Sequence, residues 1–300
     1  MDARGEPTVD VVIVSFNSSR QLREAVTPLS GTSGIRVIVA DNASSDESVE
    51  SVADLSVSVI PLPENKGFAH ACNVAWRAGN APFVLLLNPD ATIDAASLGL
   101  LVDVLRDNEG VGAAALMIRH ADGSLDHSLR RFPRLRSTYA RALFLHRLFP
   151  RAAWVDEVIR DESLYADQAS PDWVSGACIL VRRTVLERLG GLDERFFMYC
   201  EDIDLCRRIW SAGWELRFEP RALARHDGGG SAPRAALLSR LAVSRIQYAK
   251  KHRGTAATLL ERFGLILEAV TRAAVSRGGA ATRLGHLRSL SPLVRRKRRH

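Results

Sequence analysis

The N-terminal third of the chain repeats one pattern, in which a short apolar run is followed closely by turn-forming polar residues. The runs cover residues 9–15, 35–40, 57–61 and 83–87, and the polar residues after them include Asn17, Asp41, Asn65 and Asp90. Helix-capping residues follow the first three runs, at 17–19, 44–47 and 65–68. This alternation predicts a parallel α/β sheet with helices on both faces. The polar residues should then converge on one edge of the sheet, where ligands bind.

Asp and Asn after a strand are also ordinary turn residues, so each of the four has a purely structural alternative. The sequence contains neither GxGxxG nor GxxxxGK[ST], the glycine-rich loops that cradle phosphates. A divalent cation held by a carboxylate is the natural substitute, because Mg²⁺ and Mn²⁺ prefer oxygen ligands and bridge diphosphates. We expect Asp90 to be a ligand of such a cation.

The stretch from Trp173 to Trp214 carries the second candidate site. It reads as a buried strand with a glycine turn, a short helix, a Gly-Gly break, and an acidic group that opens another helix. Glu201, Asp202 and Asp204 form this group, and they have an ordinary explanation as partners of the helix dipole. Phe196–Tyr199 precede them directly, however. Desolvation by such an apolar wall raises a carboxyl pKa towards that of a working base.

Length and composition bound the class of protein. A chain of 300 residues with 46% hydrophobic content can bury one large core or two small ones. Cys72, Cys178, Cys200 and Cys206 show no zinc-ligand spacing and are expected to be reduced core thiols. No stretch reaches the roughly 20 apolar residues of a membrane span, and residues 1–8 are too polar for a signal peptide. We therefore expect a cytoplasmic protein, either free or peripheral on the cytoplasmic face of the membrane.

Charge divides the chain into an acidic body, residues 1–232, and a basic appendage, residues 233–300. The net charge is +7, yet the residues after Gly230 hold 16 Lys and Arg against two Glu. Apolar residues recur there at helical spacing and predict two amphipathic helices: Leu237, Leu241, Leu259, Phe263, Ile266, Leu267 and Val270. With the basic tail at 295–299, the appendage is suited to an anionic membrane surface. Nucleic acid is the less favoured partner, because the body contains no recognisable nucleic-acid module.

Residues 119–171 are the least informative part of the sequence. Within them, residues 128–151 combine seven Arg with aromatic and leucine side chains. One interpretation is a solvated, helix-rich excursion packed on the body. The other is an interfacial segment that binds anionic headgroups or a lipid diphosphate.

Seven motifs in order resemble glycosyltransferase family 2, most closely its bacterial rhamnosyltransferase-type members, which act on cell-surface polysaccharide precursors. They are VVIVSFNSS, VIVADNASSD, ENKGFAHACN, LLLNPDATI, WVSGACILVRR, GGLDERFFMYCEDIDLCRR and RHDGGGS, and the resemblance runs from about residue 9 to residue 231. The resemblance implies a GT-A fold, which is a Rossmann-like, mainly parallel sheet with flanking helices. It also implies a nucleotide-sugar donor, a divalent cation, and inversion at the anomeric carbon.

The resemblance also implies roles for single residues at the donor site. Asp41 would accept from the pyrimidine imide N–H of the donor. The nucleoside pocket would be lined by Ser15, Asn17, Asn65 and Gly67. Asn88-Pro89-Asp90 stands where the family has its metal-binding DxD motif, and here only the second acid is present. His226 matches the downstream metal-ligand histidine, and its imidazole would suit Mn²⁺ better than Mg²⁺; as an alternative, it is a loop histidine beside Asp227.

Asp202 matches the acid of the family's ED motif and would be the general base. Glu201 and Arg208 are candidates for substrate binding; alternatively, Glu201 and Asp204 orient Arg207 and Arg208 along the same helix. The resemblance places Trp173, Gly176 and Trp214 around the sugar and acceptor pocket, with core packing as the alternative for both tryptophans.

These observations predict a metal-dependent, inverting glycosyltransferase that moves L-rhamnose from dTDP-L-rhamnose to a lipid-linked or polysaccharide acceptor in the cell envelope. Two alternatives stay open. One is a family 2 enzyme with another donor, such as a UDP-hexose or UDP-galactofuranose. The other is a non-catalytic protein that binds a nucleotide sugar or a polyanion.

Overall fold

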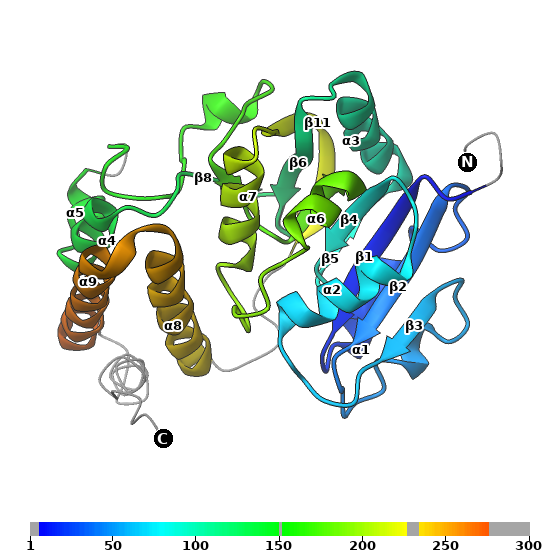
Figure 1. Cartoon of the computed structure of the whole chain (residues 1–300), viewed down its shortest axis with the longest axis horizontal. Helices are drawn as coiled ribbons and strands as arrows, with labels where there is room; N and C mark the ends of the chain where they lie inside the picture. Colours follow the sequence, from blue (N-terminus) through cyan, green and yellow to red (C-terminus); the bar gives the residue numbers. More distant parts are fainter. Residues whose placement is uncertain (1–5, 150–151, 227–233, 276–300) are drawn as a thin grey trace. The chain divides into compact units, whose positions relative to one another are not determined.

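The computed structural model describes residues 6–149, 152–226 and 234–275, which form two compact units (Figure 1). Unit 1 comprises Met1–Arg130, Asp161–Arg195 and Glu201–Ser231. Unit 2 comprises Arg131–Arg160, Phe196–Cys200 and Ala232–His300. The glycine loop at 228–231 and the basic tail at 295–299 lie outside the described residues.

Unit 1 is built on a mixed nine-stranded sheet of order β3-β2-β1-β4-β10-β6-β11-β5, with β7 paired to β6. The strands are β1 (Val9–Ser15), β2 (Ile35–Asp41), β3 (Ser58–Pro61), β4 (Phe83–Leu87), β5 (Ala91–Ile93), β6 (Val111–Arg119), β7 (Leu125–Asp126), β10 (Cys178–Arg182) and β11 (Glu215–His226). A separate two-stranded sheet pairs β8 (Leu129–Arg130) with β9 (Trp173–Val174). The expected single strand around residue 174 is thus two strands, β9 and β10, separated by the turn at Gly176.

The four strands expected from the sequence are present and parallel. β1 pairs with both β2 and β4, and β2 pairs with β3. The register places Ser15 opposite Asp41, so the polar residues that follow these strands lie at the same edge. β10 then runs antiparallel between β4 and β6, and β5 runs antiparallel to β11. The expected α/β class with a mainly parallel sheet is confirmed.

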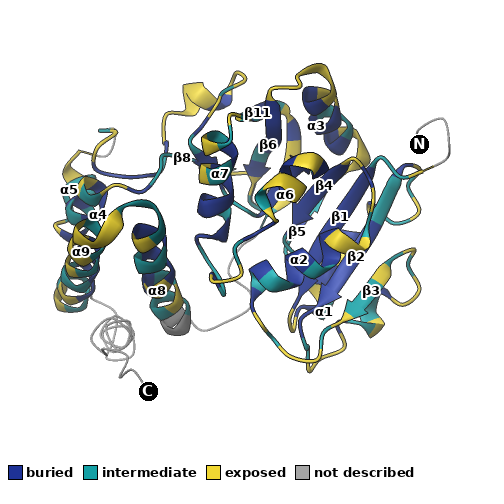
Figure 2. Ribbon diagram, in the orientation of Figure 1, coloured by how far each residue is buried: buried dark blue, intermediate teal, exposed yellow. Residues whose placement is uncertain are grey.

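Helices pack on this sheet through apolar faces, and Figure 2 shows the central strands β1, β2 and β4 as mostly buried (Figure 2). The helices of unit 1 are α1 (Ser19–Val26), α2 (Phe68–Ala78), α3 (Ala95–Asp107), α6 (Arg183–Leu189) and α7 (Glu201–Ser211). α1 buries Leu22, Ala25 and Val26, the i, i+3, i+4 spacing of one helical face. α6 ends where Gly190 takes a left-handed conformation, as a helix C-terminus commonly does.

The helix expected after residues 44–47 is not formed; this prediction was wrong. The only helical turn in that segment is the 3-10 turn η1 (Glu50–Val52). The carboxylate of Asp46 accepts from the backbone N–H of Ser48 and from that of Ser19 in α1. Such local bonding competes with helix formation, because it engages the cap in a turn.

Unit 2 contains α4 (Leu135–Ala142), α5 (Leu145–Leu148), α8 (Arg234–His252) and α9 (Gly254–Val275). The two helices expected in the appendage are therefore present as α8 and α9. Gly254, with φ of +78°, makes the turn between them. Inside unit 2, the Arg245 guanidinium pairs with Glu157 at 2.7 Å and with Glu261 at 2.9 Å. Residues from 131–160 thus share a buried ionic core with the C-terminal helices.

Two expectations about composition can be compared with the described residues. All four cysteines are free and buried. Among the helices that the structure describes, none combines the length and the apolar character needed to cross a membrane.

Candidate active site

The carboxyl ends of β1 and β2 are tied together by a polar network. The Asn17 backbone is left-handed, with φ of +51°. Its N–H donates to Ser44 Oγ at 3.0 Å, and its side-chain oxygen accepts from the Ser45 N–H at 2.8 Å. Asp41 accepts from the Ser44 N–H at 3.1 Å. Two of the predicted donor-site residues, Asn17 and Asp41, are therefore held within one loop framework.

Asn65 and Gly67 join the same edge from the next crossover. The Asn65 side-chain oxygen accepts from Asn42 Nδ2 and from the Gly67 N–H, both at 3.0 Å. Gly67, with φ of +99°, precedes α2. Ser15 is fully buried at the end of β1 and lies 3.1 Å from the Ser18 hydroxyl. Asn42 Oδ1 is buried and finds no hydrogen-bond partner among the described residues, so this pocket retains an acceptor.

Strand pairing brings Asp90 and His226 together. β5 and β11 pair with His226 opposite Ala91, so Asp90 stands next to the histidine. His226 Nε2 lies 3.2 Å from Asp90 Oδ1, and both side chains are mostly buried. Asn88, at the end of β4, is anchored by its N–H to the Ala177 carbonyl at 2.9 Å. The residues predicted to bind a metal therefore meet at one place, although 136 positions separate Asp90 from His226 in the sequence.

Asp126 is a third group at this place, and it was not predicted from the sequence. His226 Nδ1 lies 3.9 Å from Asp126 Oδ2, too long for a direct hydrogen bond but close enough for an ion pair. Burial lowers the pKa of His226, but Asp126 and Asp90 outweigh it and raise the pKa to about 9. The Asp122-Gly123 pair is typical of a hairpin turn. It could have predicted that the chain turns back and places Asp126 beside β6.

The donor set at this place fits a divalent cation shared with a substrate. A carboxylate oxygen and a neutral imidazole nitrogen are both ligands of Mn²⁺, and the carboxylate also suits Mg²⁺. A cation bound here would have to displace the proton that the raised pKa keeps on His226. The described residues contain no cluster of three or more His, Cys, Asp or Glu arranged as a complete metal site. Asp90 and His226 would therefore supply only part of the coordination shell of such a cation.

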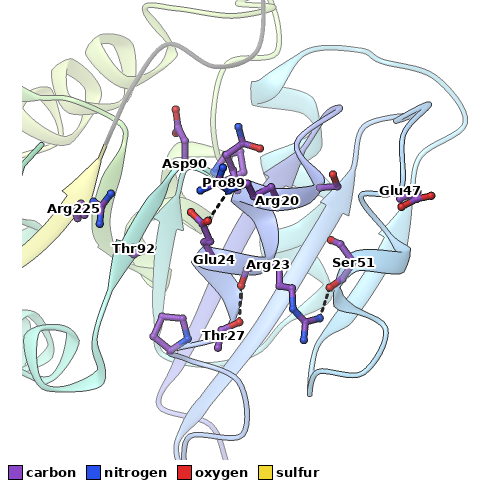
Figure 3. Close-up of a pocket in the computed structure, with 13 residues that line it drawn as sticks. Arg20, Arg23, Glu24, Thr27, Glu47, Ser51, Pro89, Asp90, Thr92 and Arg225 are labelled. Atoms are coloured by element: carbon purple, nitrogen blue, oxygen red, sulfur yellow. Dashed lines mark hydrogen bonds and ion pairs between the residues drawn. The ribbon is translucent and has the colours of Figure 1, made fainter. Parts of the chain in front are cut away.

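A cavity of about 750 Å³ opens beside Asp90. Figure 3 shows Asp90, Thr92 and Arg225 on one side of it, and Arg20, Arg23 and Glu24 of α1 towards the other (Figure 3). Arg20 pairs with Glu24 at 2.9 Å, and Arg23 pairs with Asp54. The cavity thus places cationic side chains next to the candidate metal ligand. Asp202 is not among its lining residues.

Asp202 is the second residue of α7 and is fixed through its carboxylate. One oxygen accepts from the Gly176 N–H at 3.1 Å, and the other from the Ile203 N–H at 2.8 Å. The two residues before α7, Tyr199 and Cys200, both take positive φ, which is unusual for residues with side chains.

Burial sets the protonation of the two adjacent carboxyls. It raises the pKa of Asp202, although the N–H groups of Ile203 and Gly176 and the charge of Arg130 oppose the shift. Burial and then the charge of Asp202 raise the pKa of Glu201 well above its usual range. Glu201 Oε2 is buried without a partner among the described residues. The direction of both shifts is the one predicted from the sequence for this acidic group.

Arg130 acts electrostatically on the carboxylates of both sites and was not predicted from the sequence. Its guanidinium lies 5.7 Å from the centre of the Trp173 ring, and β8 pairs directly with β9. Its positive charge lowers the pKa of Asp126 and opposes the rise in that of Asp202. Arg130 Nε is buried without a hydrogen-bond partner among the described residues. Nothing in its local sequence distinguishes Arg130 from the six other arginines of 128–151.

Two further predicted residues have different environments. Arg208 pairs with the buried Asp204 at 2.7 Å and donates to the Leu189 carbonyl at 3.1 Å, so the alternative Asp204–Arg208 pairing is present. Trp214 does not lie at the site, and its predicted place in the pocket was wrong. It packs against Gly112 next to the first residue of β11, whereas His226 is the last residue of that strand. An extended strand separates its two ends, so both cannot lie at one edge.

Comparison with known proteins decides the family. The model of "Glycosyltransferase like family 2" matches residues 7–249. The chain belongs to glycosyltransferase family 2. This glycosyltransferase is 32% identical over 239 residues to N-acetylglucosaminyl-diphospho-decaprenol L-rhamnosyltransferase of Mycobacterium tuberculosis (strain ATCC 25618 / H37Rv), covering 75% of this chain and 77% of that protein. It is also 32% identical over 169 residues to rhamnosyltransferase WbbL of Escherichia coli (strain K12), covering 53% and 60% of the two chains.

Solved structures show the fold of this family 2 glycosyltransferase. Mannosyltransferase PcManGT from Pyrobaculum calidifontis, in complex with GDP-Man and Mn²⁺, aligns with a TM-score of 0.58 at 20% identity, over 96% of this chain and 80% of that one. GalNAc-T7 with UDP, GalNAc and Mn²⁺ aligns with a TM-score of 0.58 at 13% identity, over 94% and 54%. The expected GT-A fold is confirmed.

Proposed function

We propose that the protein is an inverting rhamnosyltransferase, which transfers L-rhamnose from dTDP-L-rhamnose to a lipid-linked acceptor during envelope glycan synthesis. One observation carries this proposal: 32% identity over 75% of the chain to an enzyme named as an L-rhamnosyltransferase of N-acetylglucosaminyl-diphospho-decaprenol. That relative's name specifies both the transferred sugar and a prenyl-diphosphate acceptor.

The donor nucleoside would bind at the carboxyl ends of β1 and β2. Asp41 is 5% exposed and accepts two bonds from Ser44, and each carboxylate oxygen can accept a further bond. The pyrimidine imide N–H would donate to it. The walls of this nucleoside pocket would be formed by Ser15, Asn17, Asn65 and Gly67. Their hydrogen bonds hold the surrounding loops in place.

Asp202 would act as the general base. It takes the proton of the acceptor hydroxyl as that oxygen attacks the anomeric carbon. The new carbon–oxygen bond forms on the face opposite the diphosphate, and the bond to the diphosphate oxygen breaks with its electron pair. A single displacement of this kind inverts the anomeric centre. The raised pKa of Asp202 suits this role, because a base works best with a pKa closer to the working pH.

The other site residues would bind and orient the reactants. Asp90, helped by His226, would hold a divalent cation, which when bound offsets the charge that develops on the departing diphosphate. Asn88 lies next to this position and would contact the donor. Trp173 and Gly176 would shape the sugar pocket beside Asp202, with Glu201 and Arg208 as further substrate-binding candidates. Arg130 would add a positive charge beside the same pocket.

The location of the acceptor suggests where the enzyme works. A prenyl-linked acceptor stays in the lipid bilayer, so the enzyme would act as a peripheral protein on the cytoplasmic face of the membrane. The basic C-terminal region would contact anionic lipid there.

Nucleotide release from a panel of dTDP-, UDP- and GDP-sugars tests the proposal, with Mn²⁺ or Mg²⁺ and a prenyl-diphospho-N-acetylglucosamine acceptor. We expect turnover with dTDP-L-rhamnose, inversion at the anomeric carbon, and a loss of about 10²- to 10⁴-fold in Asp202→Asn. Asp103→Asn is the matched control, because Asp103 is exposed on α3.

The panel also separates the alternatives. Turnover with a UDP-hexose or UDP-galactofuranose in place of dTDP-L-rhamnose would disprove the donor and leave the base assignment standing. Donor binding without turnover on any acceptor, equally in Asp202→Asn, would favour a non-catalytic binding protein.

A further inference from the structure

α9 presents an apolar stripe to solvent. Leu259, Phe263 and Val270 lie at i, i+4 and i+11, which places them on one face of the helix. Their exposed fractions are 52%, 65% and 47%, large values for apolar side chains in a packed helical unit. Counted along the helix axis, the stripe is about 16 Å long at 1.5 Å per residue. Isolated exposed apolar residues are common, but several of them on one face of a helix mark an interaction surface.

The opposite face of α9 explains why the apolar stripe points outwards. Glu261 and Glu268 lie on that face and are buried. The Glu261 carboxylate pairs with the Arg245 guanidinium at 2.9 Å and accepts a hydrogen bond from the Thr138 hydroxyl at 3.0 Å. Glu268 pairs with Arg141 at 2.9 Å. These ionic contacts fix the rotation of α9, because turning the stripe inwards would separate Glu261 from Arg245 and Glu268 from Arg141.

The same pairing leaves the surface of unit 2 with one sign of charge. All four acidic side chains in its described part are buried, and each pairs with an arginine: Asp156, Glu157, Glu261 and Glu268. Exposed cations remain, namely Arg134, Arg136, Arg147, Arg240 and Lys250. The exposed surface of unit 2 is therefore apolar and cationic, without exposed acidic side chains among the described residues.

Cations and apolar side chains also meet near the C-terminal half of α9. The Thr271 hydroxyl donates to the Ala142 carbonyl at 2.8 Å, which joins α9 to the end of α4. Beyond α4, the guanidinium of Arg147 lies 4.7 Å from the centre of the Phe144 ring, and that of Arg272 lies 6.0 Å from it. Leu143 and Leu148 flank this group and are 54% and 71% exposed. Cations beside leucine and phenylalanine are typical of segments that lie in the headgroup region of a bilayer.

We propose that the outward face of α9, formed by Leu259, Phe263 and Val270, inserts into the interfacial region of an anionic phospholipid bilayer. The exposed cations of unit 2 would bind the headgroups. A second copy of this chain is a poorer occupant, because two surfaces with exposed cations and no exposed acids repel each other. The inference deepens the proposed function by naming the surface that brings the enzyme to its acceptor. The test of this surface measures membrane binding. A negative result would therefore disprove the membrane contact without disproving the proposed transferase activity.

Vesicle co-sedimentation of the full chain tests the proposal, with phosphatidylglycerol-containing vesicles compared with pure phosphatidylcholine. We expect binding to the anionic vesicles that weakens with added salt. Phe263→Ser and Leu259→Ser should each weaken it by about tenfold or more, since each removes a large apolar side chain from the lipid. Both residues are exposed, so circular dichroism should show folded proteins. Leu164→Ser in unit 1 is the matched control, because Leu164 is 43% exposed and lies outside α9.

Four results would overturn the inference. The first is unchanged vesicle binding by Phe263→Ser and Leu259→Ser. The second is equal binding to neutral and anionic vesicles. In the third, a dimer of the wild-type chain dissociates in Phe263→Ser and vesicles are not bound, which would make a second copy the occupant. In the fourth, deletion of 276–300 removes all binding while Phe263→Ser binds normally, which would assign the contact to that segment. Transferase activity on a water-soluble acceptor should be unchanged in Phe263→Ser.

Discussion

The Gly176 N–H donates to the Asp202 carboxylate at 3.1 Å, and a side chain at position 176 would crowd Asp202. A Cβ at position 176 would lie 3.0 Å from the Asp202 Cβ and 3.4 Å from its Oδ2. The first of these distances is shorter than ordinary carbon–carbon contact, so Asp202 would have to move. The close approach of the candidate base Asp202 thus explains why the WVSG motif has a glycine at position 176.

Gly176→Ala should therefore lower kcat by about 10- to 100-fold while the protein remains folded, because a small displacement of a reacting group is costly. Steady-state kinetics and thermal unfolding would be measured together. Gly99→Ala is the control, since nothing lies within 4 Å of a Cβ added there. An alanine enzyme with wild-type kcat would contradict the role given to Asp202.

The pH dependence of kcat/KM should reflect the raised pKa of Asp202. A general base works only when deprotonated, so activity falls as the pH drops through its pKa. Because burial raises that pKa, the acidic limb should lie above the usual aspartate value of about 3.9. A rate profile that stays flat down to that value would contradict the assignment.

Arg130→Gln should move this acidic limb to higher pH. The positive charge of Arg130 favours the ionised form of Asp202, so its removal lets burial raise the pKa further. The profile of kcat/KM against pH would be compared with that of Arg106→Gln, which removes an exposed arginine from α3. The same limb in Arg130→Gln and the wild type would exclude electrostatic coupling between Arg130 and the base.

Asp90→Asn should raise the concentration of Mn²⁺ needed for half-maximal activity, and a chelator should abolish turnover of the wild-type enzyme. The reason is that the variant loses the carboxylate oxygen nearest His226. Titration of the metal in the activity assay measures this, with Asp103→Asn as the control. A response to Mn²⁺ identical to that of the wild type would exclude Asp90 as a ligand.

Arg245→Met should destabilise the protein by about 3–5 kcal/mol, because Glu157 and Glu261 would remain buried without their shared partner. Denaturant unfolding gives the free energy of unfolding. Arg136→Met changes an exposed arginine of α4 and should have little effect. Equal stability of the two variants would show that the buried ionic core contributes little.

Much of the donor side of the site follows from local sequence. β1, β2 and β4 lie close to their expected bounds, because continuous apolar runs between turn residues favour buried parallel strands. The polar residues after them share an edge, because parallel strands end together. α7 begins at Glu201 as expected, with its acidic group in the first turn. These features depend on neighbouring residues, so they can be predicted from sequence patterns.

The contacts that complete the site depend on distant pairing. Asp126 reaches His226 only through the pairing of β7 and β11 with β6, and Arg130 reaches Trp173 only through β8 and β9. The sequence by itself determined that α9 has an apolar stripe with charged residues beside it. Tertiary structure decided that the stripe faces solvent, because Arg245 and Arg141 hold Glu261 and Glu268 inside. Hydrophobic periodicity defines a face of a helix, but the partners available for its charges decide which face is buried.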